Sequence, residues 1–308
     1  MQIQTVLGSI QPAALGTTMM HEHTFCDLWE WGGRRDYNGI IDDEELLAEE
    51  LAVYRSAGGS AVVDVTPEGI GRNPAGLRRL PEATGLHVVM GCGWYRERVY
   101  PALVHELDTN QLADRLIREF SDGVDGTDVR PGVIGELGTE RFRITPVEER
   151  VFRAAARAQR AVGVTISTHT THFGDLALAQ VALLREEGVP PERIIIGHLG
   201  ERRHARDVLA VAATGVFVQI DHVGRPASAG TQPEEQRARN VVEVVRAGHL
   251  DQVLLSMDIC GNSQLHWNGG HGYDYLLKTF VPLLCQEGLT EAEVRALLID
   301  NPRRALAF

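Results

Sequence analysis

Histidines and carboxylates recur in this sequence at the ends of short apolar runs, where they could hold metal ions. The residues that end these runs are His21, His23, His169, His198 and Asp258. Alternate residues of a strand point to the same face, so His21 and His23 would present two imidazoles side by side. Imidazole and carboxylate donors are typical ligands of Zn, Mn, Co or Ni. These spacings therefore predict chemistry that depends on divalent metal ions.

Eight such runs alternate with segments of helical periodicity. The predicted strands span 16–23, 60–66, 87–91, 132–137, 164–169, 193–198, 216–221 and 252–258. The predicted helices span 43–57, 74–84, 110–120, 146–161, 175–187, 205–213, 234–247, 273–287 and 291–299. Strand–helix alternation indicates a parallel sheet, and nearly continuous apolar strands indicate that helices cover it. Eight units predict an α/β fold, a (β/α)8 TIM barrel in one domain over residues 1–308. A doubly wound sheet is disfavoured because no G-x-G-x-x-G follows a strand.

In such a barrel the catalytic groups stand at the C-terminal ends of the strands. The fourth predicted strand carries Glu136 near its end. Four histidines and two carboxylates would therefore converge from five strands, enough for two divalent metal ions per chain, about 3.5–4 Å apart and bridged by a carboxylate. Each of these residues alone could be a hydrogen-bonded core residue, and His172 is the alternative to His169 if the fifth strand ends later. Five strand ends together favour the metal centre.

Composition narrows the possible partners of this 308-residue chain. Its 30 Lys and Arg against 42 Asp and Glu give a net charge of −12. That charge disfavours binding to nucleic acid or to anionic membranes, and no apolar run approaches the ~20 residues of a membrane-spanning helix. The first residues lack the features of a secretory signal, and the four dispersed cysteines indicate reduced thiols, so we expect a cytoplasmic protein. A small-molecule substrate is the remaining expectation.

Longer segments of the chain resemble the phosphotriesterase family of the amidohydrolase superfamily. The segments that carry the resemblance are TTMMHEH (17–23), VVDVTPEGIGR (62–72), PGVIGELGT (131–139), TISTHT (165–170), IIIGHL (194–199), LLSMD (254–258) and GGHGYDYLLKTF (269–280). The resemblance implies that His21, His23 and Asp258 hold the more buried metal, and that His169 and His198 hold the more exposed one.

The bridging ligand distinguishes a subgroup within this family. Most relatives bridge the two metals with a carboxylated lysine, whereas the one lysine of this chain, Lys278, lies on a predicted helix. Glu136 stands at the bridging position, as in the Glu-bridged phosphotriesterase homology proteins. This departure weakens the expectation of true organophosphate hydrolysis, which is best known in Lys-bridged members.

The predicted reaction is hydrolysis by a hydroxide that bridges the two metals, with zinc as the default metal and Mn, Co or Ni as alternatives. Asp258 is the predicted catalytic residue, because it can take a proton and pass it to the leaving group. Residues 247–277 contain no Lys or Arg. Relatives that act on phosphorylated sugar lactones carry basic residues there, so we expect a lactone or a simple carboxylic ester.

Three side chains are predicted to contact the substrate: Tyr95, Arg225 and Trp267. Asp221 is expected to orient a ligand histidine or a substrate hydroxyl. The alternatives are an N-acyl amide hydrolase, a phosphotriesterase whose activity is a weak side reaction, and a barrel that binds a ligand without catalysis. The resemblance also implies a homodimer.

Overall fold

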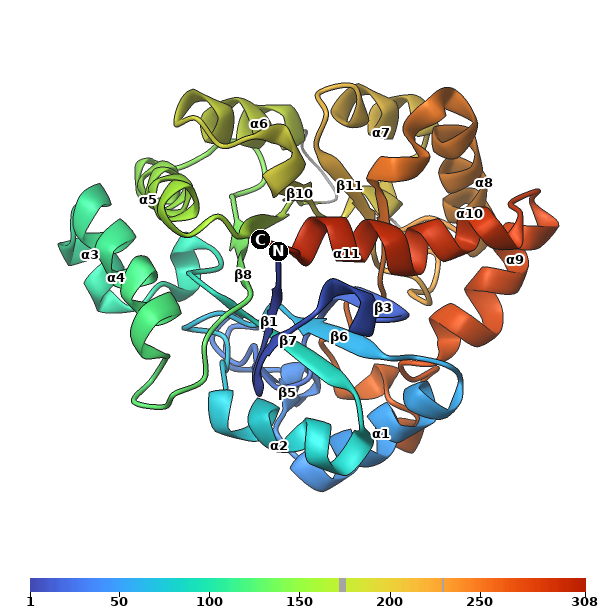
Figure 1. Ribbon diagram of the computed structural model, residues 1–308, viewed down its shortest axis with the longest axis horizontal. Helices are drawn as coiled ribbons and strands as arrows, with labels where there is room; N and C mark the ends of the chain where they lie inside the picture. Colours follow the sequence, from blue (N-terminus) through green and yellow to red (C-terminus); the bar gives the residue numbers. More distant parts are fainter. Residues whose placement is uncertain (172–175, 229) are drawn as a thin grey trace.

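In the computed structural model, eight parallel strands form one sheet that curves into a barrel with helices around it (Figure 1). The structure describes residues 1–171, 176–228 and 230–308. Neighbouring strands follow the order β12-β11-β10-β9-β8-β7-β6-β3. Their bounds are β3 Thr18–Glu22, β6 Ala61–Asp64, β7 His87–Cys92, β8 Val133–Gly138, β9 Thr165–His169, β10 Ile194–Ile196, β11 Phe217–Ile220 and β12 Val253–Leu255. Each of the eight predicted strands corresponds to one of these, so the predicted (β/α)8 architecture is confirmed.

The first and last strands meet and close the barrel. The backbone N–H of Asp258 donates to the carbonyl of His21 over 3.1 Å, and the N–H of His23 donates to the carbonyl of Ile259 over 3.2 Å. One buried apolar cluster fills the barrel interior, with residues such as Val63 and Leu254. A larger cluster lies between the strands and the helices. Both faces of the sheet are therefore covered, which explains the nearly continuous apolar runs.

Helices lie in the positions that the periodicity predicts. They are α1 Glu44–Ser56, α2 Pro74–Thr84, α4 Thr109–Asp122, α5 Pro146–Val162, α6 Ala177–Glu186, α7 Ala205–Ala212, α8 Glu234–Val244, α9 Val281–Gln286 and α10 Glu291–Arg295. The predicted start of the fifth helix, at residue 175, lies outside the described residues. Caps define the ends: Thr145 and Glu148 form a capping box at the start of α5, and Gly163 ends it with φ 83°.

Several short elements are absent from the sequence-based assignment. These are the hairpin β1 Ile3–Thr5 and β2 Gly8–Ile10, the pair β4 Cys26–Asp27 and β5 Ile40–Ile41, helix α3 Ala102–Glu106 and helix α11 Asn301–Leu306. The two termini lie side by side at the barrel axis (Figure 1), where Gln2 and Phe308 exchange backbone hydrogen bonds of 2.9 and 3.0 Å. Asn301 donates to the carbonyl of Val253 at the start of β12, so α11 covers the N-terminal ends of the strands.

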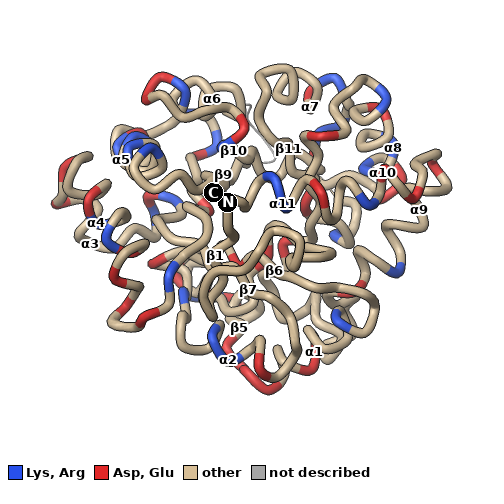
Figure 2. The backbone as a smooth tube through the Cα atoms, viewed as in Figure 1, with Lys and Arg blue, Asp and Glu red and all other residues tan. Residues whose placement is uncertain are grey.

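Charged residues of both signs are spread over the outer part of the fold. Basic and acidic residues are interspersed along the outer helices and loops (Figure 2), and the part of the chain drawn there shows no single basic stripe. Within the described ranges, no helix has both the length and the apolar character needed to cross a bilayer. All four cysteines are free thiols, as the sequence predicts.

Candidate metal centre

The C-terminal ends of five strands bring the six predicted metal ligands together. His21 lies on β3, Glu136 on β8 and His169 at the end of β9, while His23, His198 and Asp258 lie one, two and three residues past the ends of β3, β10 and β12. His169 keeps 13% of its side chain exposed, and the other five residues are at most 5% exposed. The strand-end argument therefore placed all six side chains in one buried cluster.

Glu136 lies at the centre of this cluster and contacts all four histidines. Its Oε2 lies 3.3 Å from His21 Nε2, 3.4 Å from His169 Nδ1 and 3.4 Å from His198 Nε2. Its Oε1 lies 3.3 Å from His23 Nε2. The two oxygens thus face different histidines, which is the arrangement that a carboxylate shared by two cations requires.

The two carboxylate oxygens of Asp258 face different groups. Oδ1 lies 3.2 Å from His23 Nε2 and 3.8 Å from His21 Nε2. Oδ2 turns away from them and lies 2.8 Å from His222 Nε2 and 2.5 Å from Arg225 Nη2. One oxygen therefore belongs to the ligand cluster, and the other connects the cluster to the loop after β11.

The donor set fits divalent cations. Three groups have ligand atoms within 4.8 Å of one another, namely His21–Glu136–His198, His21–His23–Asp258 and His198–His222–Asp258. Both ring nitrogens of His21 and the Oε2 of Glu136 are buried without a hydrogen-bond partner among the described residues. A buried polar atom left unpaired costs about 1–3 kcal/mol. Cations between these imidazoles and carboxylates would satisfy those atoms and offset the cost.

Electrostatics of the cluster favour ionised carboxylates. Burial alone would raise the pKa of Glu136, but the facing imidazoles of His21, His169 and His198 outweigh it and hold that pKa well below its usual range. Burial and the neighbouring His198 lower the pKa of His169 to about 4. His169 is therefore neutral at pH 7, which is the form of imidazole that binds a metal ion.

Side chains behind the ligands fix the orientation of the imidazoles. Asp221 Oδ1 accepts from His198 Nδ1 over 2.9 Å, and its Oδ2 accepts from the backbone N–H of His198 over 3.0 Å. His198 Nε2 consequently faces the cluster, which is the orienting role expected of Asp221. On the other side, Thr66 Oγ1 lies 2.9 Å from His23 Nδ1.

Irregular backbone aims several of these side chains. The pairing register shifts between Met19 and Glu22 on β3 and between Ile134 and Leu137 on β8, and these two intervals contain His21 and Glu136. Such bulges redirect side chains from one face of a strand to the other. His198, His222 and Asp258 each follow a strand with φ of 59°, 65° and 52°. Left-handed backbone in residues with side chains costs about 1–3 kcal/mol each and concentrates at functional sites.

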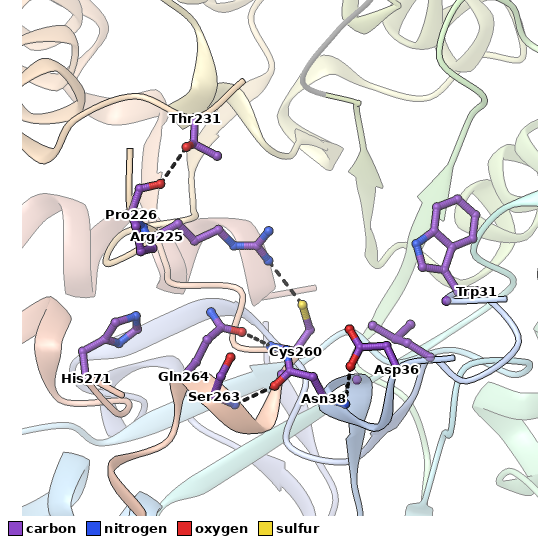
Figure 3. Close-up of a pocket in the computed structure, with 14 residues that line it drawn as sticks. Trp31, Asp36, Asn38, Arg225, Pro226, Thr231, Cys260, Ser263, Gln264 and His271 are labelled. Atoms are coloured by element: carbon purple, nitrogen blue, oxygen red, sulfur yellow. Dashed lines mark hydrogen bonds between the residues drawn. The ribbon is translucent and has the colours of Figure 1, made fainter. Parts of the chain in front are cut away.

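A cavity of about 280 Å³ opens onto the cluster. Its wall contains Glu136 and Asp258, together with His23, His169, His198, His222, Leu28, Trp31, Ile70, Tyr95, Arg96 and Arg225. A second cavity of about 360 Å³ shares Leu28, Trp31, Arg225 and Cys260 with it. Arg225 Nη2 lies 3.2 Å from Cys260 Sγ at this boundary, and polar side chains such as Asn38, Ser263 and Gln264 surround the second cavity (Figure 3). The two cavities therefore adjoin at the four residues that they share.

The structure brings two of the three predicted substrate contacts to this place. Tyr95 lines the cavity of about 280 Å³ next to the ligand cluster, which we call the metal cavity, and its hydroxyl lies 3.3 Å from His169 Nδ1. Arg225 lines both cavities. Trp267 does not reach either cavity. It is 75% exposed and lies against α1, because its backbone N–H donates to Glu50 and the adjacent His266 bridges Glu50 and Asp274.

Some residues of the site are missing from the sequence-based set. His222 Nδ1 lies 3.1 Å from Glu201 Oε1, so His222 connects Asp258 to a second buried carboxylate. Its position directly after a predicted strand was a signal that could have identified it. Arg96 and Cys260, by contrast, lie in loops whose course no sequence pattern indicates. His172, the alternative to His169, lies outside the described residues.

Comparisons with known proteins agree with this geometry. A model of the phosphotriesterase family matches residues 1–306. The chain is 36% identical over 287 residues to the phosphotriesterase homology protein of Escherichia coli (strain K12), across 93% of this chain and 96% of that protein. It is 30% identical to N-acetyltaurine hydrolase of Danio rerio over an alignment 343 positions long, across 100% and 98% of the two chains. The crystal structure of a lactonase from Listeria monocytogenes superposes with a TM-score of 0.92 at 28% identity, across 100% and 99%.

The family model, the relatives and the barrel with its buried ligand cluster all cover nearly the full chain. Glu136, which the resemblance places at the bridging position, contacts all four histidines of the cluster. We conclude that this chain is a hydrolase that belongs to the phosphotriesterase family.

Proposed function

We propose that the protein is a binuclear metal-dependent hydrolase that cleaves a lactone or a simple carboxylic ester. The observation that supports this most is the contact of one carboxylate, Glu136, with four histidines at the C-terminal ends of three other strands, β3, β9 and β10. Two divalent cations held there, zinc by default, would acidify a water molecule and polarise the carbonyl of the substrate. The predicted homodimer remains part of the proposal.

Asp258 and His222 are the residues proposed to accept and transfer the proton during the reaction. Burial tends to raise the pKa of Asp258, but Arg225, His222 and His23 outweigh it and hold that pKa well below its usual range. A proton that Asp258 takes from the attacking water would therefore pass readily to the leaving group, and His222 Nε2, 2.8 Å from Oδ2, offers a second acceptor on that path. Glu201 Oε1, 3.1 Å from the other ring nitrogen, stabilises the resulting imidazolium.

The walls of the cavity position the substrate and exclude water. Tyr95 presents its hydroxyl beside His169, and Ile70 and Trp31 supply apolar surface next to the cluster. A phosphorylated substrate is disfavoured because the loop at 259–272 carries no Lys or Arg. The lactonase neighbour supports the same substrate class.

Amide hydrolysis is the second candidate. The Danio rerio relative named N-acetyltaurine hydrolase aligns over the whole chain, and an N-acyl amide presents the same carbonyl to the centre. Phosphotriester cleavage would be a weak side activity. A barrel that only binds a ligand is disfavoured, because the full set of six ligands and the Asp258–His222 pair are present.

The test combines metal content with a substrate panel. Protein loaded with zinc and desalted is expected to hold about two metals per chain and to hydrolyse lactones or aryl esters faster than N-acyl amides and paraoxon. Glu136→Gln should lose both metal and turnover, whereas Glu44→Gln, which alters an exposed ion pair with Arg79, should lose neither. Loaded protein that hydrolyses no member of the panel, or turnover that survives removal of the metals, would contradict the proposal.

A further inference from the structure

We propose that Arg96 recognises a carboxylate on the substrate and so sets a preference for substrates that carry one negative charge. This inference rests on the proposed hydrolase function. Arg96 follows Tyr95 in the loop after β7 and lines the metal cavity, together with Glu136 and His169. It is only 7% exposed. A guanidinium is therefore held in the wall of the cavity, beside the groups proposed to carry out the reaction.

The buried guanidinium has incomplete compensation from the protein. Burying a charge is costly unless it is paired and hydrogen-bonded. Arg96 Nη2 donates to Glu140 Oε2 over 2.7 Å, and the guanidinium carbon lies 4.2 Å from the centre of the Trp31 ring. Its Nε is buried with no hydrogen-bond partner in the described parts of the chain. The charge is thus sequestered at the cavity without a full set of acceptors.

Glu140, the carboxylate that pairs with Arg96 in the described part of the chain, stands near solvent. The side chain of Glu140 is 37% exposed, against 8% for that of Arg96. Partly exposed ion pairs contribute little because water and salt screen them. Trp31 covers a face of the guanidinium but supplies no acceptor. A hydrogen bond from Arg96 to an additional acceptor inside the cavity would consequently contribute more free energy than the ion pair with Glu140 does.

The side chain of Arg96 is held in place before any substrate binds. Its stem lies on the backbone of Gly138 in β8, where an added Cβ would stand 2.5 Å from Arg96 Cγ. A residue with a side chain at position 138 would displace this stem. A guanidinium fixed in this way presents its donors at low entropic cost, and its planar fork matches a carboxylate.

The charge pattern of the two cavities favours a single negative charge. Arg225, the other guanidinium in the metal cavity, is already paired with Asp258. A doubly charged phosphate would need further cations, and the loop at 259–272 supplies none. The guanidinium of Arg96 is then the positive charge left to bind the substrate. It matches one substrate carboxylate, with the scissile carbonyl at the ligand cluster.

The experiment uses two pairs of esters, on the zinc-loaded full chain. The first pair, 4-acetoxybenzoate and its methyl ester, differs by a carboxylate on the leaving group. The second pair, the mono-4-nitrophenyl ester of adipic acid and 4-nitrophenyl hexanoate, differs by a carboxylate on the acyl chain. The measured quantity is the ratio of kcat/KM for the charged ester to kcat/KM for the neutral ester. The pair in which the wild type prefers the charged ester identifies which end of the substrate Arg96 binds.

Arg96→Gln is expected to lower this ratio by about 10- to 100-fold in one of the pairs, mainly through KM, since a hydrogen bond to a charged group contributes about 1.5–3 kcal/mol. Arg98→Gln is the matched control, because Arg98 lies 5.5 Å from the same Trp31 ring but is exposed and does not line the cavity. It should leave the ratio unchanged. Arg96→Lys keeps the charge without the fork, so it should lower the ratio by several-fold, and it serves if Arg96→Gln fails to fold.

If Arg96→Gln lowers kcat/KM equally for the charged and the neutral ester of each pair, the role of Arg96 in recognition is overturned and a structural role is indicated. If Arg96→Gln does not fold, an unchanged kcat/KM ratio in Arg96→Lys has the same meaning. The hydrolase proposal would survive that result if the wild type still hydrolyses the neutral esters in a metal-dependent way. A wild type that hydrolyses none of the four esters would instead contradict the hydrolase proposal, and this inference with it.

Discussion

Replacing Asp258 by Asn tests the proton pathway with a change of one atom. The amide keeps one oxygen, which can still face His23, now 3.2 Å from Oδ1. Its nitrogen then faces His222 Nε2 and Arg225 in place of Oδ2, and it cannot accept a proton from the reaction. General acid–base catalysis contributes about 10²- to 10⁴-fold, so kcat should fall by that factor.

The assay is steady-state hydrolysis of the preferred ester, with metal content measured on the same sample. We expect about two metals per chain to remain, because Glu136 and the four histidines are unchanged. Asp251→Asn is the control, since Asp251 is an exposed carboxylate near the start of β12, at the opposite end of the barrel. A kcat within threefold of the wild type, with both metals bound, would refute the role of Asp258.

Three more outcomes follow from the same geometry. His222→Asn should lower kcat by about 10- to 100-fold, which is less than for Asp258→Asn. Asp258 Oδ2 can still accept the proton in this variant, but it can no longer pass the proton to residue 222; stopped-flow or steady-state turnover measures the loss of kcat. Glu22→Gln should lower the free energy of unfolding in urea by about 1–3 kcal/mol, because the carboxylate accepts from Ser256 Oγ and from the N–H groups of Met257 and Ile259, and an amide nitrogen would confront one of these donors. Removal of metals with a chelator should lower the thermal midpoint, and added zinc should restore it, since a ligand that binds only the folded state stabilises that state; an unchanged midpoint would contradict a metal centre.

The sequence predicted the barrel well because burial on both faces leaves a direct signature. The strands β6 and β12 are short, but their apolar runs stand out between amphipathic helices. Once the barrel was assigned, its topology placed His21, His169 and Asp258 at one end, although they are far apart in the chain. The ligand cluster was therefore predictable without any knowledge of side-chain contacts.

Features that depend on distant contacts could not be predicted in this way. Strand β1 has three residues and owes its position to burial of Ile3 and to pairing of the termini, neither of which leaves a periodic pattern. The loop that carries Trp267 is tied to Glu50, more than 200 positions earlier, and this contact turns the indole outward. Arg96 takes its place from Gly138 on another strand.

The left-handed residues after β10, β11 and β12 have a consequence for engineering this molecule. His198, His222 and Asp258 adopt backbone that glycine would tolerate at lower cost, so Gly at these positions would relieve local conformational energy while abolishing the site. In screens of metal-free protein, which lack the stability that bound metal supplies, selection for thermal robustness alone would be drawn toward such inactive variants. Mutagenesis libraries for this barrel should keep these three positions fixed and seek their gains on the outer helices.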